Sequence, residues 1–112
     1  MSDDRLPTEL WVTAHVRQCT SAAVPVYVVR RGDKHGGMVM LKLNQLDAGC
    51  RVLSQTRDFD GRRAWLGAFN GERVSEAEAD AYIARAIDRD PDLWVVEIEH
   101  PEGWHPFEGE VV

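Results

Sequence analysis

Residues 93–99, Leu-Trp-Val-Val-Glu-Ile-Glu, constrain the fold more than any other segment of this 112-residue chain. Side chains of an extended strand point alternately to its two faces. The two apolar sets that result are Trp94, Val96 and Ile98 on one face and Leu93 and Val95 on the other. A strand with apolar side chains on both faces is covered on both faces. The segment thus predicts a sheet that is covered, at least in part, on both sides of this strand.

Residues 8–23 have the periodicity of a helix. Val12, Val16 and Cys19 recur at helical spacing, and Pro25 ends the segment. The Leu-Trp-Val-Thr stretch within it has strand propensity, so an extended start is the alternative. We predict the helix.

A second helix is predicted to begin after Ser75. Ser75 and Glu78 have the spacing of a capping box, in which the serine oxygen accepts a hydrogen bond from an N–H of the first turn. Apolar residues then recur at helical spacing: Ala79, Tyr82, Ile83, Ala86 and Ile87. Pro91 ends the helix, because the residue before a proline is disfavoured in the helical conformation.

Four further strands are predicted between the helices, at residues 26–31, 38–46, 51–57 and 63–69. Gly32, Gly36 and Gly37 separate the first two strands. They predict a tight turn, in which the glycines supply positive φ angles. The second strand would then return beside the first, and the four strands would form an antiparallel meander.

The predicted order is α-β-β-β-β-α-β. This is an α+β fold with a mainly antiparallel five-stranded sheet, and we expect both helices on one face of it. The length fits a single domain of residues 1–112. Its ends are expected to be a short frayed start at residues 1–7 and an irregular tail at residues 100–112.

Two helices on one face would leave the other face of the sheet open, although the strands carry apolar residues there. Trp104 and Phe107 of the tail could fold back over that face. We expect instead that a second copy of the chain covers it, with the tail at the rim. The sequence therefore predicts a homodimer or a protein partner on the open sheet face.

Composition is that of a folded protein rather than a disordered one, with 44% hydrophobic and 29% charged residues. No apolar run is long enough to span a bilayer, and the start lacks the pattern of a signal peptide. Cys19 and Cys50 have neither metal-binding nor redox spacing, so we expect reduced thiols, at least one of them buried. These features predict a cytoplasmic protein with no membrane contact and no cofactor.

Two groups of acidic or histidine residues are candidates for a catalytic or metal site. His100, Glu102 and His105 are possible ligands, but their spacing matches no zinc pattern, and we predict no bound metal. Glu97 and Glu99 share a strand face, and paired carboxylates can serve acid–base catalysis in a cleft. The sequence shows no such cleft, and a strand end that runs into water is the simpler interpretation.

The candidate surface for a partner or ligand consists of basic side chains at predicted strand ends or turns, with one aromatic beside them: Arg30, Arg31, Arg62, Arg63 and Trp65. Arginines and exposed aromatics on a sheet are typical of RNA-binding proteins. The net charge of −6 opposes that function. Residues 30–63 carry eight basic and four acidic side chains, but residues 64–112 carry three and twelve, which would repel phosphates.

Three stretches form a recognisable signature: Glu-Leu-Trp-Val at 9–12, Arg-Arg-Gly-Asp at 30–33, and Asp-Pro-Asp-Leu-Trp-Val-Val-Glu-Ile-Glu at 90–99. Together they resemble a small alphaproteobacterial family of unknown function with roughly 110 residues. The last stretch is the most specific, and the resemblance covers about residues 5–108. It implies a bacterial cytoplasmic protein that stands alone. It supplies no functional residues, because no activity is established for the family.

The sequence therefore predicts a non-enzymatic protein-interaction or accessory module. One alternative is a small enzyme with a cleft lined by Arg31, Glu97 or Glu99. Another is an RNA-binding accessory protein that uses the arginine surface. The sequence assigns no catalytic residue.

Overall fold

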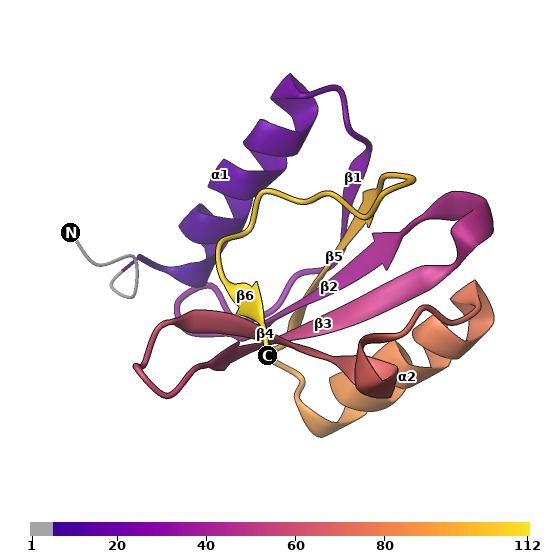
Figure 1. Cartoon of the computed structure of the whole chain (residues 1–112). Helices are drawn as coiled ribbons and strands as arrows, with labels where there is room; N and C mark the ends of the chain where they lie inside the picture. The colour runs from indigo at the N-terminus through magenta and orange to yellow at the C-terminus, as the bar shows by residue number, and fades with distance from the viewer. Residues whose placement is uncertain (1–5) are drawn as a thin grey trace.

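The structure is a computed structural model that describes residues 6–112, and this part of the chain forms two helices and six strands (Figure 1). The elements are α1 (Thr8–Ser21), β1 (Val26–Arg30), β2 (Val39–Asn44), β3 (Cys50–Arg57), β4 (Arg63–Gly67), α2 (Glu76–Arg89), β5 (Trp94–Glu99) and β6 (Glu110–Val111). Two 3-10 helices, η2 (Leu46–Ala48) and η3 (Ala68–Gly71), follow β2 and β4. The α+β class and the predicted order are confirmed, and β6 adds a strand in the tail. Residues 1–5 of the predicted frayed start lie outside the described residues.

Both predicted helices form, and they begin with different kinds of cap. At α2, the Ser75 hydroxyl oxygen accepts a hydrogen bond from the Glu78 backbone N–H at 3.2 Å, as predicted. At α1, Pro7 precedes the helix without a side-chain cap. The backbone N–H groups of Thr8 and Glu9 instead donate to carbonyl oxygens in the loop of residues 31–38, at 3.2 and 3.0 Å. That loop therefore stabilises the start of α1.

The sheet has the strand order β1-β5-β2-β3-β4-β6, so β5 lies between β1 and β2. The predicted hairpin of the first two strands, and with it the four-strand meander, is wrong. β5 pairs antiparallel with β1 but parallel with β2, while β3 pairs antiparallel with β2 and β4 as predicted. The reason is burial, because β2 and β5 are apolar on both faces and a strand inside the sheet can bury both.

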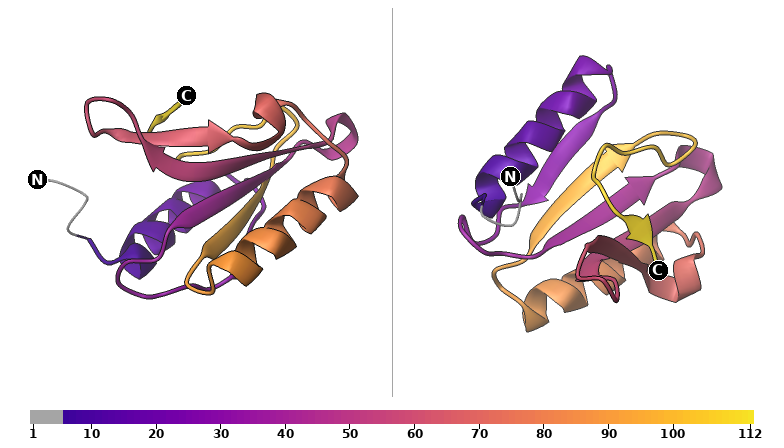
Figure 2. Two further views of the ribbon diagram at one scale, coloured as in Figure 1. Left: turned by 90° about the horizontal axis from the view of Figure 1, so that it is seen from below. Right: turned by 60° about the vertical axis from the view of Figure 1, so that its left-hand side comes forward.

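The two helices pack on opposite faces of the sheet, as Figure 2 shows. α1 packs in a buried cluster with Val96 and Ile98 of β5, and α2 packs in another with Val95. The prediction of both helices on one face is wrong, because β5 has two apolar faces and one helix covers each. Within residues 6–112, the central strands are thus covered on both sides. The open face that motivated the homodimer is absent there, although the homodimer itself stays a prediction.

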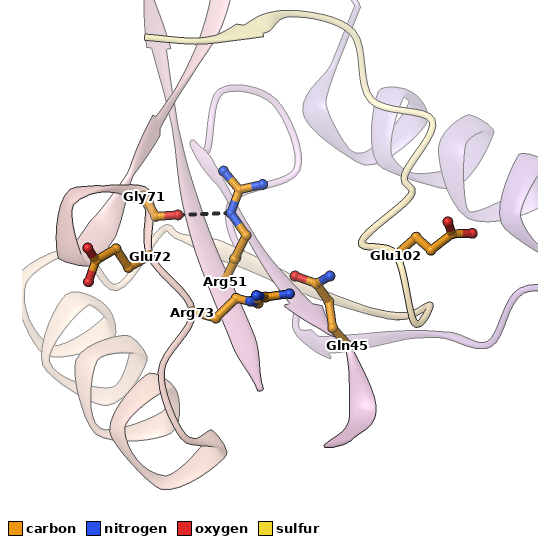
Figure 3. Close-up of a pocket in the computed structure, with 6 residues that line it drawn as sticks. All are labelled: Gln45, Arg51, Gly71, Glu72, Arg73 and Glu102. Atoms are coloured by element: carbon orange, nitrogen blue, oxygen red, sulfur yellow. Dashed lines mark hydrogen bonds between the residues drawn. The ribbon is translucent and has the colours of Figure 1, made fainter. Parts of the chain in front are cut away.

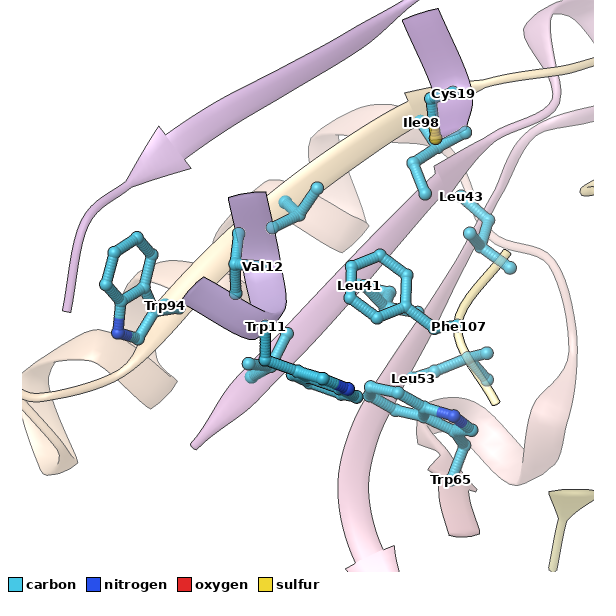
Figure 4. Close-up of a cluster of buried hydrophobic side chains, with 12 residues drawn as sticks. Trp11, Val12, Cys19, Leu41, Leu43, Leu53, Trp65, Trp94, Ile98 and Phe107 are labelled. Atoms are coloured by element: carbon cyan, nitrogen blue, oxygen red, sulfur yellow. The ribbon is translucent and has the colours of Figure 1, made fainter. Parts of the chain in front are cut away.

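The tail completes the core on the α1 side of the sheet (Figure 4). Phe107 is 4% exposed, and its ring meets that of Trp11 edge to face with the centroids 5.2 Å apart. The indole N–H of Trp65 donates to the Glu108 carbonyl oxygen at 2.9 Å, which fixes the tail to β4. Of the two tail aromatics considered as covers, Phe107 is buried, whereas Trp104 is 40% exposed.

The loop of residues 31–38, called the crossing loop below, crosses the start of β5 instead of forming a tight turn. None of its three glycines has a positive φ, so the predicted reason for them is wrong. A Cβ atom on Gly32 or Gly37 would lie 2.1 or 2.3 Å from the Asp92 carbonyl oxygen, and also too close to the Trp94 ring. The Trp94 indole N–H donates to the Asp33 carbonyl oxygen at 2.7 Å. The glycines are therefore required by the close approach of the loop to β5.

Replacement of Gly37 by alanine is expected to lower the free energy of unfolding by about 1–3 kcal/mol, because the new methyl group forces the loop away from β5. Gly36→Ala is the matched control, since its nearest atom would be the Asp33 carboxylate oxygen at 4.0 Å. Urea denaturation of both variants measures the difference. Equal stabilities of the two variants would contradict this account of the loop.

Cys19 and Cys50 are free thiols, and both are buried, which confirms the expectation that at least one lies in the core. They belong to the two clusters on opposite faces of the sheet. Burial raises the pKa of both thiols, so they stay protonated and unreactive at neutral pH.

Among residues 6–112, no helix has the length and apolar character needed to cross a membrane.

Candidate functional site

Arg30 and Arg31 lie where β1 ends, next to the start of β5. Arg30 donates from its guanidinium to the Pro91 carbonyl oxygen at 2.9 Å. Arg31 forms an ion pair with Glu9 of α1, and its guanidinium carbon lies 5.3 Å from the centroid of the Trp94 ring. These contacts hold the crossing loop against α1 and β5.

Arg62 and Arg63 lie at the same end of the sheet, on the turn into β4. The strand order places four inter-strand steps between β1 and β4, which is about 19 Å. Arg62 is exposed, and the Arg63 guanidinium stacks over the Trp11 ring at 4.2 Å. Trp65 is only 1% exposed, so it offers no surface on which a base could stack. A binding role for the four arginines stays a prediction, and the buried Trp65 removes one reason for expecting RNA.

The residues of the alternative enzyme cleft do not come together. Arg31 lies at the start of β5, and Glu99 lies at its end, about 17 Å away along the strand. Glu97 accepts a hydrogen bond from the Asn44 side-chain amide at 3.0 Å and faces the Lys42 ammonium at 3.6 Å. Its carboxylate therefore belongs to a separate polar cluster.

That cluster is centred on Lys42, which is 5% exposed and lies under the start of α2. Its ammonium bonds to Glu76 and Asp80 of α2 at 2.8 and 2.7 Å. Burial lowers the pKa of Lys42, but the hydrogen bonds to Asp80 and Glu76 and the charge of Glu97 outweigh burial and raise it. The ammonium thus stays charged, and it links α2 to β2 and β5 rather than serving as a nucleophile.

The tail histidines shape turns. The Nδ1 atoms of His100 and His105 accept hydrogen bonds from the backbone N–H groups of Glu102 and Phe107, each at 3.1 Å. Within residues 6–112, no three His, Cys, Asp or Glu side chains gather in a group that could hold a metal ion. The absence of a bound metal stays a prediction.

The outer edge of β1 is the first of two surfaces that the geometry singles out. β1 is the last strand of the sheet, and three consecutive apolar residues are exposed on it: Tyr27 at 50%, Val28 at 37% and Val29 at 54%. The Glu99 N–H donates to the Pro25 carbonyl oxygen at 3.0 Å. In an antiparallel ladder such bonded pairs alternate, so Tyr27 also bonds to β5. The backbone groups of Val26 and Val28 therefore point out of the sheet.

The two edges of the sheet differ. At the far edge, β6 covers part of β4, and the Val112 N–H extends the pairing by a bond to the Trp65 carbonyl oxygen at 2.8 Å. Short edge strands of this kind are a common protection against pairing with other chains. β1 has no such cover in residues 6–112, and its regular pairing with β5 ends in a bulge after Val28.

The second surface is a pocket of about 550 Å³ at the opposite end of the sheet from the crossing loop (Figure 3). Its lining comes from four separated segments: Gln45, Arg51, Gly71, Glu72, Arg73 and Glu102. The Nε–H of Arg51 donates to the Gly71 carbonyl oxygen at 3.1 Å, which fixes the guanidinium. Gln45 is buried, and its amide donates to the Pro101 carbonyl oxygen at 3.2 Å. This bond holds the tail in place, so that the tail forms one wall of the pocket.

The pocket lining carries two arginines and two glutamates, and the two kinds of side chain are not paired with each other. In the described part of the chain, neither Arg51 nor Arg73 forms an ion pair. In Figure 3 the carboxylates of Glu72 and Glu102 point away from the two guanidinium groups. His105 is close enough to Arg51 to feel its charge. The pKa of His105 is lowered mainly by burial and further by the charges of Arg51 and His15.

Comparison with known proteins identifies the family. A family model described as "Protein of unknown function (DUF1491)" matches residues 6–108. The chain belongs to the DUF1491 family. This confirms the resemblance that the sequence signature indicated. Because the family is one of unknown function, membership assigns a fold to the chain but no activity. No curated protein matches it.

Solved DUF1491 structures agree with the fold of this chain. A crystal structure of a DUF1491 family protein from Caulobacter crescentus CB15 is 36% identical, covers 94% of this chain and 98% of its own, and has a TM-score of 0.84. An NMR structure of a DUF1491 family protein from the same organism is 34% identical, with coverages of 96% and 98% and a TM-score of 0.82. Protein Atu0922 from A. tumefaciens is 25% identical over 86% of each chain, with a TM-score of 0.70.

Sequence reasoning missed both arginines of the pocket, although Arg51 gave a signal. In β3 it shares a face with Leu53, and it pairs with Leu43 of β2, so a cation stands in an otherwise apolar row. Such a residue needs a polar environment or a partner. Arg73 gave no comparable signal, because it lies in a link of irregular structure before Ser75.

Proposed function

We propose that this protein is a protein-interaction module that acts as a homodimer, with two copies paired along their β1 edges. The supporting observation is the β1 edge itself, where exposed apolar side chains accompany backbone groups that point out of the sheet. Such an edge pairs readily with another strand, since main-chain hydrogen bonds give affinity and side chains give specificity.

The regular part of β1 fits an antiparallel pairing about a two-fold axis at Tyr27. Val26 of one copy then faces Val28 of the other, and the outward backbone groups of these residues form about four hydrogen bonds. The two Tyr27 side chains meet in a closely spaced pair, with Cα atoms about 4.5 Å apart. Cross-strand aromatic and β-branched pairs of this kind stabilise a sheet. The bulge after Val28 lies outside the paired segment.

Charge favours this arrangement over a parallel one. Arg30 is the one charged residue of β1. In the antiparallel pairing the two Arg30 residues are separated by six residue steps, about 20 Å, which exceeds the screening length of about 8 Å at physiological salt. A parallel pairing would instead place them about 5 Å apart, where like charges repel.

The pairing is short, so we expect a weak dimer. With three paired residues in each copy, we expect it to bury less than the roughly 1,200 Å² at the lower limit of standard interfaces. A dissociation constant on the order of micromolar or weaker follows. The protein would therefore exchange between monomer and dimer. The fraction of dimer would rise with the concentration of the protein.

Analytical ultracentrifugation from low-micromolar to millimolar protein tests the dimer. The wild type is expected to rise from 12.6 kDa toward twice that mass. Tyr27→Lys should stay monomeric, because it brings two ammonium groups together at the axis. Phe59→Lys is the control, since this fully exposed aromatic lies in the turn between β3 and β4. A wild type that stays at 12.6 kDa throughout, or a loss of dimer in the control, would rule out the β1 pairing.

Location in the cytoplasm also stays a prediction. The two free, buried thiols support it, because reduced cysteines are usual in a reducing compartment. Fractionation of the host cell measures it, and recovery in an oxidising compartment would contradict it.

A further inference from the structure

We propose that the Arg51–Arg73 pocket binds a small polar molecule through an oxyanion, either a phosphate or a carboxylate group. The inference is independent of the β1 pairing. The pocket's volume of about 550 Å³ lies within the range of about 300–1,000 Å³ typical of small-molecule sites. The pocket is therefore larger than a lone ion requires.

The lining restricts the ligand to a polar one. The six residues around the pocket contribute two guanidinium groups, two carboxylates, one amide and a glycine, and none contributes an apolar side chain. An aliphatic or aromatic ligand would gain little free energy by binding here, because no apolar side chain of the lining packs against it. Lipid tails and hydrophobic peptides are excluded by the same argument.

The guanidinium of Arg51 has an orientation suited to binding an oxyanion. It is half-buried, and the hydrogen bond from its Nε to the Gly71 carbonyl oxygen sets the plane of the guanidinium. Figure 3 shows its two terminal nitrogens pointing away from Gly71. A planar pair of N–H donors in a fixed position matches the geometry of phosphate and carboxylate oxygens. The fixed plane lowers the ordering cost of binding.

Arg73 adds a second positive charge to the lining of the same pocket. Two guanidinium groups that share a pocket repel each other, and in the described residues no carboxylate pairs with either. An anion bound in the pocket offsets that repulsion. The acidic side chains of the pocket do not fill this position, since Glu72 and Glu102 point outward in Figure 3.

His105 provides an internal reporter of the bound anion. Its pKa is lowered by burial and by the charges of Arg51 and His15. A bound anion next to Arg51 offsets that guanidinium charge, so the pKa of His105 is expected to rise on binding. A general effect of salt on exposed groups would not raise the pKa of this half-buried histidine to the same extent.

The test is an NMR titration of the full chain with two probes, inorganic phosphate and succinate, at constant ionic strength. Saturable shifts are expected at the amides of Arg51, Gly71 and Arg73, together with a higher pKa of His105. Saturation by phosphate alone assigns a phosphate ligand, saturation by succinate alone assigns a carboxylate, and either result supports the site. Shifts that stay linear with both probes would overturn the proposal.

Variants separate the pocket from general charge. Arg73→Met and Arg51→Met are each expected to weaken binding at least tenfold. Arg85→Met is the matched control, because Arg85 is exposed on α2, on the opposite face of the sheet, and it should bind like the wild type. Arg73 is also exposed, so its loss should leave the fold intact even if Arg51→Met does not fold. Unchanged affinity in Arg73→Met, or an equal loss in Arg85→Met, would contradict the proposed site.

Discussion

Replacement of Trp94 by alanine is expected to lower the free energy of unfolding by about 3–5 kcal/mol. Trp94 is 1% exposed and packs in the cluster on the α1 side of the sheet. Its indole N–H bonds to the Asp33 carbonyl oxygen, and the crossing loop packs on its ring. The substitution thus opens a cavity and also releases the loop that caps α1.

Urea denaturation followed by circular dichroism measures this effect. Trp104→Ala is the matched control, because Trp104 is 40% exposed and belongs to neither buried cluster. Its cost is expected to be below about 1 kcal/mol. Equal losses of stability in the two tryptophan variants would contradict a central role of Trp94 in the core.

Replacement of Phe107 by alanine is expected to lower the free energy of unfolding by a similar amount, about 3–5 kcal/mol. The Phe107 ring stacks on His15 with the centroids 4.4 Å apart and meets Trp11 edge to face. The side chain is the point at which the tail enters the core on the α1 side. Its removal leaves a cavity between α1 and the sheet.

Phe59→Ala provides the comparison for Phe107, since Phe59 is fully exposed in the turn between β3 and β4. Its effect should lie within about 0.5 kcal/mol of zero. A small effect of Phe107→Ala in the same denaturation experiment would show that the tail is an external arm rather than part of the core.

Features that depend on neighbouring residues could be predicted from the sequence. The two faces of β5 follow from the alternation along a strand, and all five apolar residues at positions 93–96 and 98 are buried as that alternation indicates. The start of α2 follows from Ser75 and Glu78, whose hydrogen bond forms within one turn. Both signals are local in the chain, so no knowledge of the tertiary fold is needed to read them.

Features that depend on distant segments could not be predicted in the same way. The insertion of β5 between β1 and β2 joins strands that are more than 50 residues apart, and turn chemistry at Gly32 to Gly37 suggested a hairpin instead. The two apolar faces of β5 did contain the information that each face needs its own helix. The arginine pocket could not be predicted, because its six residues come from four segments that meet only in the folded chain.

Backbone hydrogen exchange as a function of protein concentration tests the β1 pairing most directly. The N–H groups of Val26 and Val28 point out of the sheet, whereas that of Tyr27 bonds to β5. If two copies pair along β1, exchange at Val26 and Val28 slows as concentration rises from micromolar to millimolar, and exchange at Tyr27 changes much less. Exchange at Val26 and Val28 that is independent of concentration would contradict the proposed homodimer.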